Sequence, residues 1–505
     1  MNHIRPNLFY LGKQSISQVS GVQCTRHLSS VAAPHPSVQN VKDPKTGIVL
    51  INMGGPGTID EVHDYLLKIM TDRDMIQLPV QRRNDNNKTI ANQTPHQRRE
   101  KAAWLVAFRI HGYQNLEKTA SVSFTTIRTD LHLVTQLGPY IARRRTPEVQ
   151  KKYSEIGGGS PILKWTKRQG ELLCEKLDVL SPETAPHKYY VAFRYANPLT
   201  DVTLEEMEKD GLERAVLFSQ YPQYCCSTTG SSFNAIYKYY KDSSKMAHHM
   251  KGEAQNARSL DPTLCQRHHS LAFKLHCPTD SNPFLGQRHE RSPKVPPGIK
   301  WSIIDRWSTH PLLAKTIAER IRTELKEFPE SIKKDVIIMF TAHSIPLKVV
   351  NRGDAYPSEV GATVQLVMKE LGYCNPYSLV WQSKVGPLPW LGPFTDESLK
   401  GYVKQGKKNF ILVPVAFVNE HIETLHELDI EYCHDLGKEL GVENIRRAAA
   451  PNDHPIFIDG LTDIVLNHLK SGPRISPKFL TRCPHCTNAR CEMSKSWFAQ
   501  LCSQQ

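Results

Sequence analysis

Short apolar segments that alternate with amphipathic ones constrain the fold of this chain more than any other feature. The first half contains three runs with the length and composition of buried strands, at residues 46–52, 188–195 and 214–219. The second half repeats the pattern at residues 301–305, 335–341, 378–382 and 409–417. Strands with nearly continuous apolar residues are typical of parallel sheets that helices cover on both faces.

Amphipathic segments separate these strands, for example at residues 310–328 and 421–436. The sequence therefore predicts an α/β protein with two doubly wound, Rossmann-like domains, parallel sheets and a central cleft. In such folds, ligands bind beyond the carboxyl ends of the strands. We expect an N-terminal domain at residues 43–220, a C-terminal domain at 221–470 and a short cysteine-rich extension at 471–505.

Two stretches interrupt this alternation, at residues 82–136 and 243–298. Both are polar, basic and rich in His, Asn and Gln, and neither has a usable periodicity. Compact domains rarely contain structureless loops of this length. We therefore interpret both stretches as insertions into the two domains.

Residues 1–42 have the composition of a targeting segment. They contain no Asp or Glu and many Ser and Gln, and their four basic residues are Arg5, Lys13, Arg26 and Lys42. Acid-poor leaders of this kind are typical of mitochondrial or plastid transit peptides. A matrix compartment is reducing, so the twelve cysteines of the chain favour thiols and metal ligands over disulfides.

The net charge of +14 does not predict a nucleic-acid partner, because it is concentrated in three segments. Residues 1–42, 82–136 and 243–298 carry net charges of +4, +5 and +4, which leaves the rest of the chain nearly neutral. No run of 18 apolar residues occurs, so the sequence predicts no transmembrane helix.

The C-terminal cysteines predict a metal centre. Cys483, Cys486 and Cys491 form C-x2-C-x4-C, which is one ligand short of a closed four-thiolate site. Such a site fits structural zinc or an iron–sulfur cluster. Spacing leaves the fourth ligand open, because Cys502 is near in sequence and the adjacent pair at 225–226 precedes an apolar segment.

Three carboxylates follow the strand at 409–417. Glu423, Glu427 and Glu431 recur every fourth residue, so a helix would place them on one face. Like charges at this spacing repel one another, which favours cation binding or proton relay over a purely structural role. The alternative is an acidic, solvated helix face.

A histidine occurs where the chain leaves another predicted strand. His343 follows DVIIMFTA, and a histidine at such a position is a natural proton acceptor near neutral pH. The alternative is a hydrogen-bonded turn histidine. Two polar strand ends in the same half of the chain favour the functional interpretation.

A basic and glycine-rich segment suggests an anion site. The arginine run at 143–145, Tyr153 and the sequence GGGS at 157–160 combine forked donors with backbone that can approach an anion closely. A solvated basic run is the alternative. Trp390, in the segment WQSKVGPLPW, offers an aromatic wall for a flat ligand or, alternatively, belongs to the core.

Together these motifs resemble a known family. The segments LINMGGP, KYSEIGGGSPI, HKYYVAFRY, YPQYCCSTTGSS, TAHSIP, NRGDAYP, VWQSKVGPLPWLGP and HIETLHELDIEY closely resemble animal-type ferrochelatases. These are mitochondrial enzymes that insert ferrous iron into protoporphyrin IX, which gives protoheme and releases two protons. The resemblance covers residues 43–81, 137–242 and 299–505, and it implies the family's two chelatase-type domains.

The resemblance also implies roles for single residues. His343 is expected to receive pyrrole protons or position the metal, and Glu423 and Glu427 to form the proton or metal path, with His421 at the start of the same helix. The family has an aspartate before this histidine where the present chain has Glu420. The implied porphyrin contacts are Met53, Arg144, Arg145, Tyr153, Ser160, Arg194, Tyr195 and Trp390.

The resemblance further implies a [2Fe–2S] cluster. Its ligands would be Cys226, Cys483, Cys486 and Cys491, which selects Cys226 as the fourth cysteine. The implied partners are protoporphyrin IX, ferrous iron, the matrix face of the inner mitochondrial membrane and a second copy in a homodimer. No nucleic-acid partner is implied.

Two alternatives to a catalytic ferrochelatase follow from the same residues. The stretch 82–136 interrupts the apolar lip that covers the porphyrin in this family, so the chain could be a non-catalytic iron–sulfur or porphyrin-binding isoform. Alternatively, its four-cysteine site could hold structural zinc. Retention of His343, Glu423 and Glu427 favours the enzyme.

Overall fold

The computed structural model describes residues 43–72, 74–75, 131–241, 298–386 and 388–503. Contacts group Asp43–Gln505 into one compact unit, separate from Met1–Lys42. The predicted transit peptide and most of the two predicted insertions lie outside the described residues.

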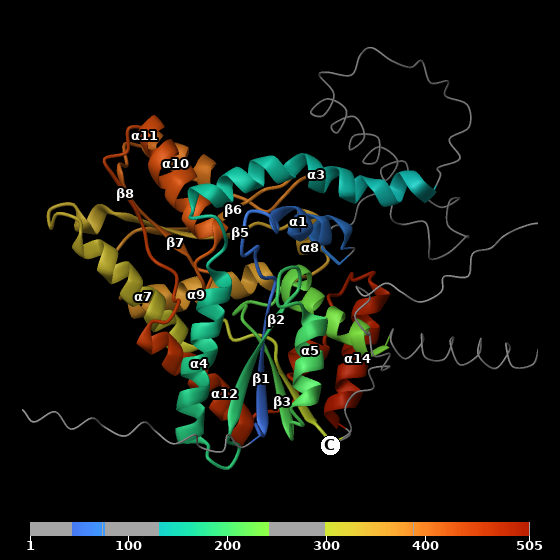
Figure 1. Ribbon diagram of the computed structural model, residues 1–505. Coiled ribbons are helices and arrows are strands. Elements are labelled where there is room, and N and C mark those ends of the chain that lie inside the picture. The colour runs from blue at the N-terminus through green and yellow to red at the C-terminus, as the bar shows by residue number, and fades with distance from the viewer. Residues whose placement is uncertain (1–42, 73, 76–130, 242–297, 387, 504–505) are drawn as a thin grey trace, which may run out of the picture. The chain divides into compact units, whose positions relative to one another are not determined.

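The first sheet contains four parallel strands in the order β2-β1-β3-β4 (Figure 1). They are β1 (Thr46–Asn52), β2 (His187–Phe193), β3 (Arg214–Ser219) and β4 (Lys300–Ile304). All seven residues of β1 are buried, as expected for a central strand with both faces covered. β4 pairs with β3 although it follows residues 243–298, so the first sheet takes its edge strand from the range predicted as the second domain.

The second sheet repeats this arrangement with the order β6-β5-β7-β8, again with every pair parallel. Its strands are β5 (Ile337–His343), β6 (Tyr377–Gln382), β7 (Asn409–Pro414) and β8 (Asn444–Arg447). β8 was not predicted, because the sequence NIRR has no apolar run and forms a polar edge strand. The predicted α/β architecture with two parallel sheets is confirmed.

Helices connect the strands of both sheets. Those of the first half are α1 (Val62–Thr71), α3 (Leu131–Glu155), α4 (Ile162–Leu180), α5 (Thr200–Lys209), the short π-helical turn η2 (Cys226–Gly230) and a helix at residues 231–241. Those of the second half are α7 (Pro311–Lys326), η4 (Lys333–Asp335), α8 (Leu347–Asn351), α9 (Tyr356–Glu370), α10 (Thr395–Lys404), η5 (Glu423–Leu436), α11 (Gly437–Glu439) and α12 (Pro455–Lys470). The C-terminal extension contains α13 (Pro477–Leu480) and α14 (Ala489–Ser503).

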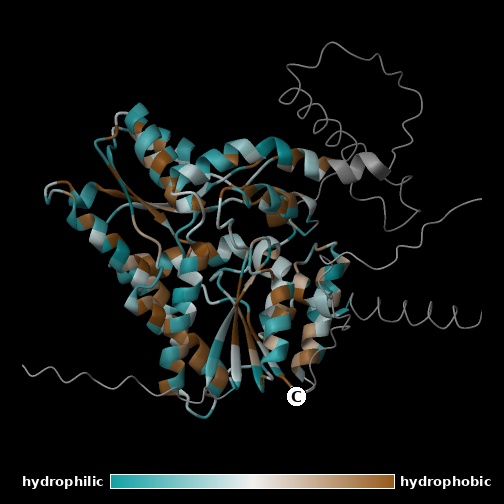
Figure 2. Ribbon diagram, in the orientation of Figure 1, coloured by the Kyte–Doolittle hydropathy of each residue, from teal (hydrophilic) through white to brown (hydrophobic). Residues whose placement is uncertain are grey.

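One hydrophobic core joins the two sheets. It includes Ile48 of β1, Phe218 of β3, Phe340 of β5 and Ile411 of β7, together with side chains of α4, α7, α9 and α12. Figure 2 shows the hydrophobic residues along the strands and on the inner faces of these helices, with polar residues on the outer faces. The helices between the sheets therefore fix the position of each sheet relative to the other.

Two helices differ from the sequence prediction. α3 begins at Leu131, inside the stretch predicted as an insertion, and continues through Pro139 and Pro147. The predicted amphipathic helix at 421–436 is a π-helix over Glu423–Leu436, with wider turns than an α-helix. Hydrophobic periodicity does not distinguish these two helix types over such a length. None of the helices within the described ranges is long and apolar enough to cross a membrane.

Candidate active site and cysteine centre

The carboxyl ends of β5 and β6 place a histidine beside a strained serine. His343 is the last residue of β5 and lies in register with Gln382, the last residue of β6. The following residue, Ser383, has a φ of 62°, in the left-handed region that side chains disfavour. Such conformations persist only where the surrounding contacts hold them, and they cluster at functional sites.

Ser383 contacts both carboxylates that the sequence singled out. Its backbone N–H donates to Glu427 Oε1 at 2.8 Å, and its hydroxyl donates to Glu427 Oε2. The same hydroxyl lies 3.2 Å from Glu423 Oε2. A serine has one hydroxyl proton, so it cannot donate to both carboxylates at once. The arrangement therefore suits two carboxylates that share a proton or a cation.

Glu427 has two further donors. Gln382 Nε2 donates at 3.1 Å and the Tyr432 hydroxyl donates at 3.0 Å. Burial, followed by the charge of Glu423, raises the pKa of Glu427, while the facing His343 and the hydrogen bonds oppose this shift. The result is a carboxyl group that holds a proton at a higher pH than a solvated glutamate does.

The hydrogen bonds of His343 determine which ring nitrogen is free. Its Nδ1 lies 2.5 Å from the carbonyl oxygen of Ser344, which can only accept a hydrogen bond. Nδ1 therefore carries the proton in the neutral ring, and Nε2 remains as the proton acceptor. The ring centroid lies 6.2 Å from that of Trp390, whose backbone bridges to Pro346. An aromatic side chain thus stands beside the candidate base.

Glu431 does not join the other two carboxylates. Its Oε1 forms an ion pair with Lys152 of α3 at 2.7 Å and lies 3.3 Å from Nδ1 of His426. Nε2 of His426 in turn contacts Glu155 of α3 at 2.6 Å. The prediction of one face with three carboxylates therefore holds for Glu423 and Glu427 only. The third carboxylate connects η5 to α3.

His421 and Glu420, which precede η5, have separate partners. Nε2 of His421 lies 3.9 Å from Glu423, and its Nδ1 contacts the carbonyl oxygen of Asn419 at 3.0 Å. Glu420 forms an ion pair with Arg447 at 2.9 Å and accepts the N–H of Ala450. The Glu420 carboxylate is therefore engaged by Arg447 and by the backbone of Ala450.

Residues of the first half gather at the carboxyl end of β1. Arg194 Nη2 and the Tyr195 hydroxyl both donate to Oδ2 of Asp72, at 2.7 and 2.6 Å. The backbone N–H of Tyr195 donates to the carbonyl of Met53 at 3.1 Å. Asp72 ends α1, and its side chain is 6% exposed. It was not among the predicted site residues, because no motif marks it.

The predicted propionate contacts lie on and after α3. Arg144 is exposed, Arg145 is half-buried, and Tyr153 is buried. Ser160 lies beside Gly55, where an added Cβ would approach the serine hydroxyl to 2.7 Å. Ser160 therefore lies at the turn that follows β1.

The charge of Glu423 links the site residues of the second half electrostatically to those of the first half. Burial is the main cause of the raised pKa of Tyr65, Tyr153 and Tyr221, and the charge of Glu423 raises each of them further. Tyr221 donates to Asn52 at 3.0 Å and accepts the N–H of Met53 at 3.1 Å. The charge of Glu423 therefore reaches the tyrosines beside the turn that follows β1.

The cysteines converge without forming a single compact group. Burial raises the pKa of Tyr224, and the Cys491 and Cys226 thiolates act in the same direction. Burial also raises the pKa of Cys491 to about 11, with further contributions from Cys486 and Cys483. Cys226 and Cys491 therefore both lie near Tyr224, and Cys483 and Cys486 lie near Cys491. Their donor set fits a cluster with two irons, which binds its thiolates in two pairs.

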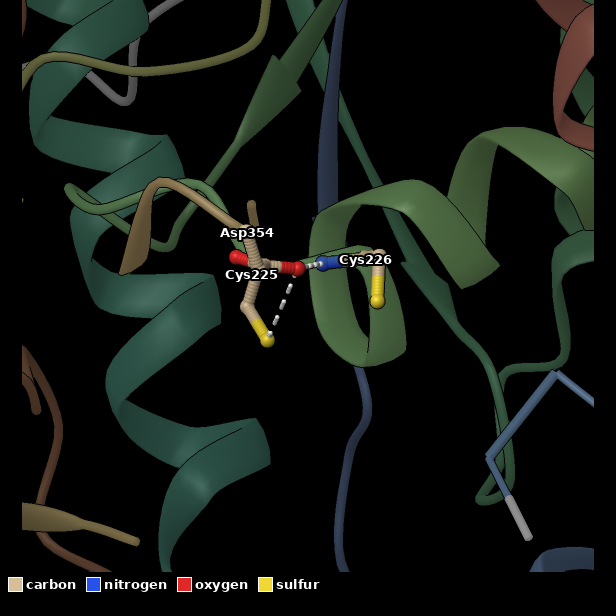
Figure 3. Close-up of side chains that lie close together, drawn as sticks. All are labelled: Cys225, Cys226 and Asp354. Carbon is tan, nitrogen blue, oxygen red and sulfur yellow. Dashed lines mark hydrogen bonds between the residues drawn. The ribbon is translucent and has the colours of Figure 1, made fainter. Parts of the chain in front are cut away.

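A different group is the tightest one in the part of the chain that the structure describes. Ligand atoms of Cys225, Cys226 and Asp354 lie within 4.8 Å of one another (Figure 3). Asp354 Oδ2 accepts the backbone N–H of Cys226 at 2.9 Å and lies 4.0 Å from Cys225 Sγ. Sequence spacing gave no indication of Asp354, which follows α8.

Comparison with known proteins identifies the family. A family model described as ferrochelatase matches residues 45–105, 124–253 and 285–469. Drosophila melanogaster mitochondrial ferrochelatase is 56% identical over 460 residues, which cover 91% of this chain and 93% of that protein. The chain belongs to the ferrochelatase family.

More distant ferrochelatases match over similar lengths. The mitochondrial ferrochelatase of Homo sapiens is 46% identical, with 92% of this chain and 85% of that protein covered. That of Schizosaccharomyces pombe is 36% identical, with 90% and 82% covered. Among solved structures, Bacillus subtilis SirB with Fe3+ has a TM-score of 0.32 and 10% identity, with 59% of this chain and 88% of that chain covered.

The ferrochelatase family model extends into both predicted insertions. Between residues 45 and 469 it leaves unmatched only residues 106–123 and 254–284. Residues 82–105 and 124–136, which lack clear periodicity, thus belong to the part that the family shares. The family match therefore covers parts of both stretches predicted as insertions.

Proposed function

We propose that this ferrochelatase-family chain inserts ferrous iron into protoporphyrin IX, forms protoheme and releases two protons. The observation that carries the proposal is the contact of Ser383 with both Glu423 and Glu427, next to His343. Metal insertion must remove two pyrrole protons and exchange the water on Fe²⁺ for other ligands. A base and a pair of oxygen donors in one site supply both functions.

His343 is the proposed acceptor of pyrrole protons. Its Nδ1 donates to the Ser344 carbonyl oxygen, 2.5 Å away, which leaves Nε2 to accept a proton. Trp390, with its ring centroid 6.2 Å away, would limit how a flat macrocycle approaches this nitrogen. The base is therefore presented beside an aromatic wall.

Glu423 and Glu427 are the proposed oxygen ligands or proton carriers. Fe²⁺ is a substrate in this reaction, and carboxylates are suitable donors for the delivery of a hydrated cation. The raised pKa of Glu427, caused by burial and by Glu423, suits a group that takes up and releases a proton during the reaction. His421, 3.9 Å from Glu423, would assist at the start of η5.

The porphyrin would lie between the two groups of site residues. We assign Arg144 and Arg145 to the propionates, since guanidinium groups bind carboxylates in a forked geometry. Tyr153 and Ser160 would contact the same side, although Tyr153 is buried and would need the local packing to open. Met53, Arg194 and Tyr195 would line the opposite side, with Asp72 holding the last two.

Cys226, Cys483, Cys486 and Cys491 are the proposed ligands of a [2Fe–2S] cluster. When bound, the cluster would supply bonds that link the C-terminal extension to the segment after β3. Burial raises the pKa of Cys491 to about 11, so binding must remove a proton that the free thiol retains at neutral pH. A visible absorption spectrum separates this cluster from a structural zinc site, because zinc thiolates are colourless.

We further propose that the protein acts in the mitochondrion, bound peripherally to the matrix face of the inner membrane as a homodimer. The family and the composition of residues 1–42 support the location. The domain boundaries at 43–220, 221–470 and 471–505 also remain proposals, with β4 as a strand that crosses the first boundary.

The experiment is anaerobic turnover of the protein from residue 43 onward, with Fe²⁺ and protoporphyrin IX and optical detection of heme. We expect turnover, and we expect His343→Ala to abolish it while leaving the far-ultraviolet circular dichroism unchanged. His434→Gln is the matched control, because that histidine side chain is 73% exposed. Substantial turnover by the His343→Ala protein would contradict the proposed role.

Deletion of residues 106–123 tests the non-catalytic alternative. This segment lies outside the family match, so its removal should preserve or raise turnover. A full-length protein without turnover that becomes active after the deletion would support the blocked isoform. Equal turnover of the two proteins would exclude it.

A further inference from the structure

The loop between α8 and α9 contacts both segments that carry the proposed cluster ligands. One segment contains Cys226 and follows strand β3 of the first sheet. The other contains Cys483 and Cys486 and belongs to the C-terminal extension. Residues 352–354 lie between them and belong to neither, since they follow β5 and α8 of the second sheet.

The Asp354 side chain holds the segment with Cys226. Its Oδ2 accepts the Cys226 N–H at 2.9 Å, and its Oδ1 accepts the N–H of Tyr356 at 3.0 Å (Figure 3). The residue is 7% exposed, so these charge-assisted bonds are shielded from water. A second buried carboxylate, that of Glu359, accepts the N–H of Tyr224 at 2.8 Å. Two carboxylates from one segment thus fix the backbone on both sides of Cys225.

The backbone of the same loop holds the C-terminal cysteines. The carbonyl oxygen of Arg352 accepts the N–H of His485 at 3.1 Å. Gly353 has a φ of 92°, and a Cβ added there would lie 2.6 Å from Cδ of Pro484. Pro484 and His485 are the two residues between Cys483 and Cys486, so the C-x2-C turn packs directly against this glycine.

We propose that residues 352–354 form a docking scaffold that sets the spacing between Cys226 and the Cys483–Cys486 turn. Asp354 and Gly353 are then positioning residues for the cluster, and the inference rests on the proposed [2Fe–2S] function. Asp354 acts in this proposal as a clamp, since each of its oxygens accepts a backbone N–H. Cluster ligands on separate segments need such a scaffold, since no local spacing fixes their distance.

The experiment compares anaerobically purified wild-type protein with Gly353→Ala, Asp354→Asn and Gly372→Ala. Gly372 is the control, because its positive φ of 67° also disfavours alanine while no atom lies within 4 Å of an added Cβ. Iron and acid-labile sulfide per chain, visible absorption and the rate of bleaching by a chelator are measured. Circular dichroism verifies that each variant is folded.

We expect Gly353→Ala and Asp354→Asn to bleach about tenfold faster than the wild type, with lower iron and sulfide content. Gly372→Ala should remain within about twofold of the wild type, since only its backbone is strained. Asparagine at position 354 cannot accept both N–H groups, because its amide has a single acceptor oxygen.

A double variant tests the contact itself and covers the case in which Gly353→Ala folds poorly. Pro484→Ala removes the two ring carbons nearest the added Cβ and leaves the backbone nitrogen at 3.6 Å. Gly353→Ala combined with Pro484→Ala should therefore recover cluster content relative to Gly353→Ala alone. Pro484→Ala alone is the reference.

The outcomes separate the two levels of the proposal. Wild-type protein without iron, sulfide or visible absorption would overturn the cluster assignment and the scaffold with it. Wild-type protein with a cluster, together with Gly353→Ala and Asp354→Asn proteins that match it in content and bleaching rate, would overturn the scaffold alone.

Discussion

Ser383 donates its backbone N–H to the Glu427 carboxylate at 2.8 Å from a left-handed backbone conformation, with a φ of 62°. The same serine hydroxyl reaches Glu423 and Glu427. A strained residue at the end of β6 therefore determines where the two carboxylates lie relative to His343. This relationship links the sheet to η5 and gives rise to the first two predictions.

Glu427→Gln should reduce iron insertion by about a hundredfold, the range expected when a general acid–base group is lost. It should also change how stability depends on pH. The pKa of Glu427 is raised in the folded protein, so its contribution to stability is present below the ordinary pKa of 4.5 and is lost as pH rises through the folded pKa. Urea midpoints measured from about pH 4.5 upward should therefore fall more steeply for wild type than for the variant.

The pH slope, and not the absolute stability, decides this test, because glutamine also alters the hydrogen bonds to Ser383 and Gln382. Glu443→Gln is the control, since this glutamate side chain is 54% exposed and pairs with Lys408 at the surface. Parallel slopes for wild type and Glu427→Gln would contradict a raised pKa.

Substitution of Ser383 should separate the hydroxyl from the backbone strain. Ser383→Ala and Ser383→Gly both lose the hydroxyl, so both should lose iron insertion to a similar extent, about tenfold or more. Glycine tolerates the positive φ, so Ser383→Gly should be more stable than Ser383→Ala by about 1 kcal/mol. Turnover and urea unfolding of the two variants check this, and equal stabilities would argue against strain at this position.

Asp72→Asn should destabilise the fold and disturb the site. One oxygen of Asp72 accepts from both Arg194 and Tyr195 in a nearly buried position, so loss of its charge should cost about 1–3 kcal/mol of unfolding free energy. The KM for porphyrin should rise as these two side chains lose their common partner. Glu206→Gln is the control, because its ion pair with Lys188 is exposed and should contribute under about 1 kcal/mol. Equal losses in the two variants would contradict the prediction.

His468 should make the protein sensitive to acid. Burial lowers its pKa from 6.5 to about 4, so the unfolded chain binds a proton more readily than the folded one. The contribution of neutral His468 to the free energy of unfolding is present above pH 6.5. It is lost as pH falls toward 4, by about 3 kcal/mol in all.

His468→Gln should flatten this pH dependence in urea titrations. His434→Gln should retain the wild-type slope, since that histidine side chain is 73% exposed. An unchanged slope for His468→Gln would show that another group causes the loss of stability in acid.

The strands were predictable because a buried parallel strand leaves a nearly uninterrupted apolar run. β1 has the predicted bounds, and β5 and β7 differ from the predicted strands only at their ends. β8 escaped prediction because an edge strand needs only backbone partners, and its side chains are mostly polar and partly exposed. The sequence also did not predict that β4 belongs to the first sheet, because strand pairing does not follow sequence order.

Candidate site residues were predictable when they belong to a motif at the end of a strand. They were not predictable when only a contact between distant parts of the chain places them in the site. His343, Glu423 and Glu427 were identified from their places in the sequence. Ser383 and Asp72 were not, because a positive φ and a shared acceptor oxygen leave no pattern in the sequence. Glu431 was grouped with the wrong partners, because regular spacing alone does not reveal the Lys152 of α3 that attracts it.

The sequence by itself determined the α/β class, the family and the candidate site residues, because strand runs and motifs are local properties of the chain. Tertiary structure decided which of these side chains meet. It placed Ser383 between two carboxylates, turned Glu431 toward α3, and set the loop at 352–354 against both cysteine segments. These outcomes depend on packing between residues hundreds of positions apart, which local patterns do not encode.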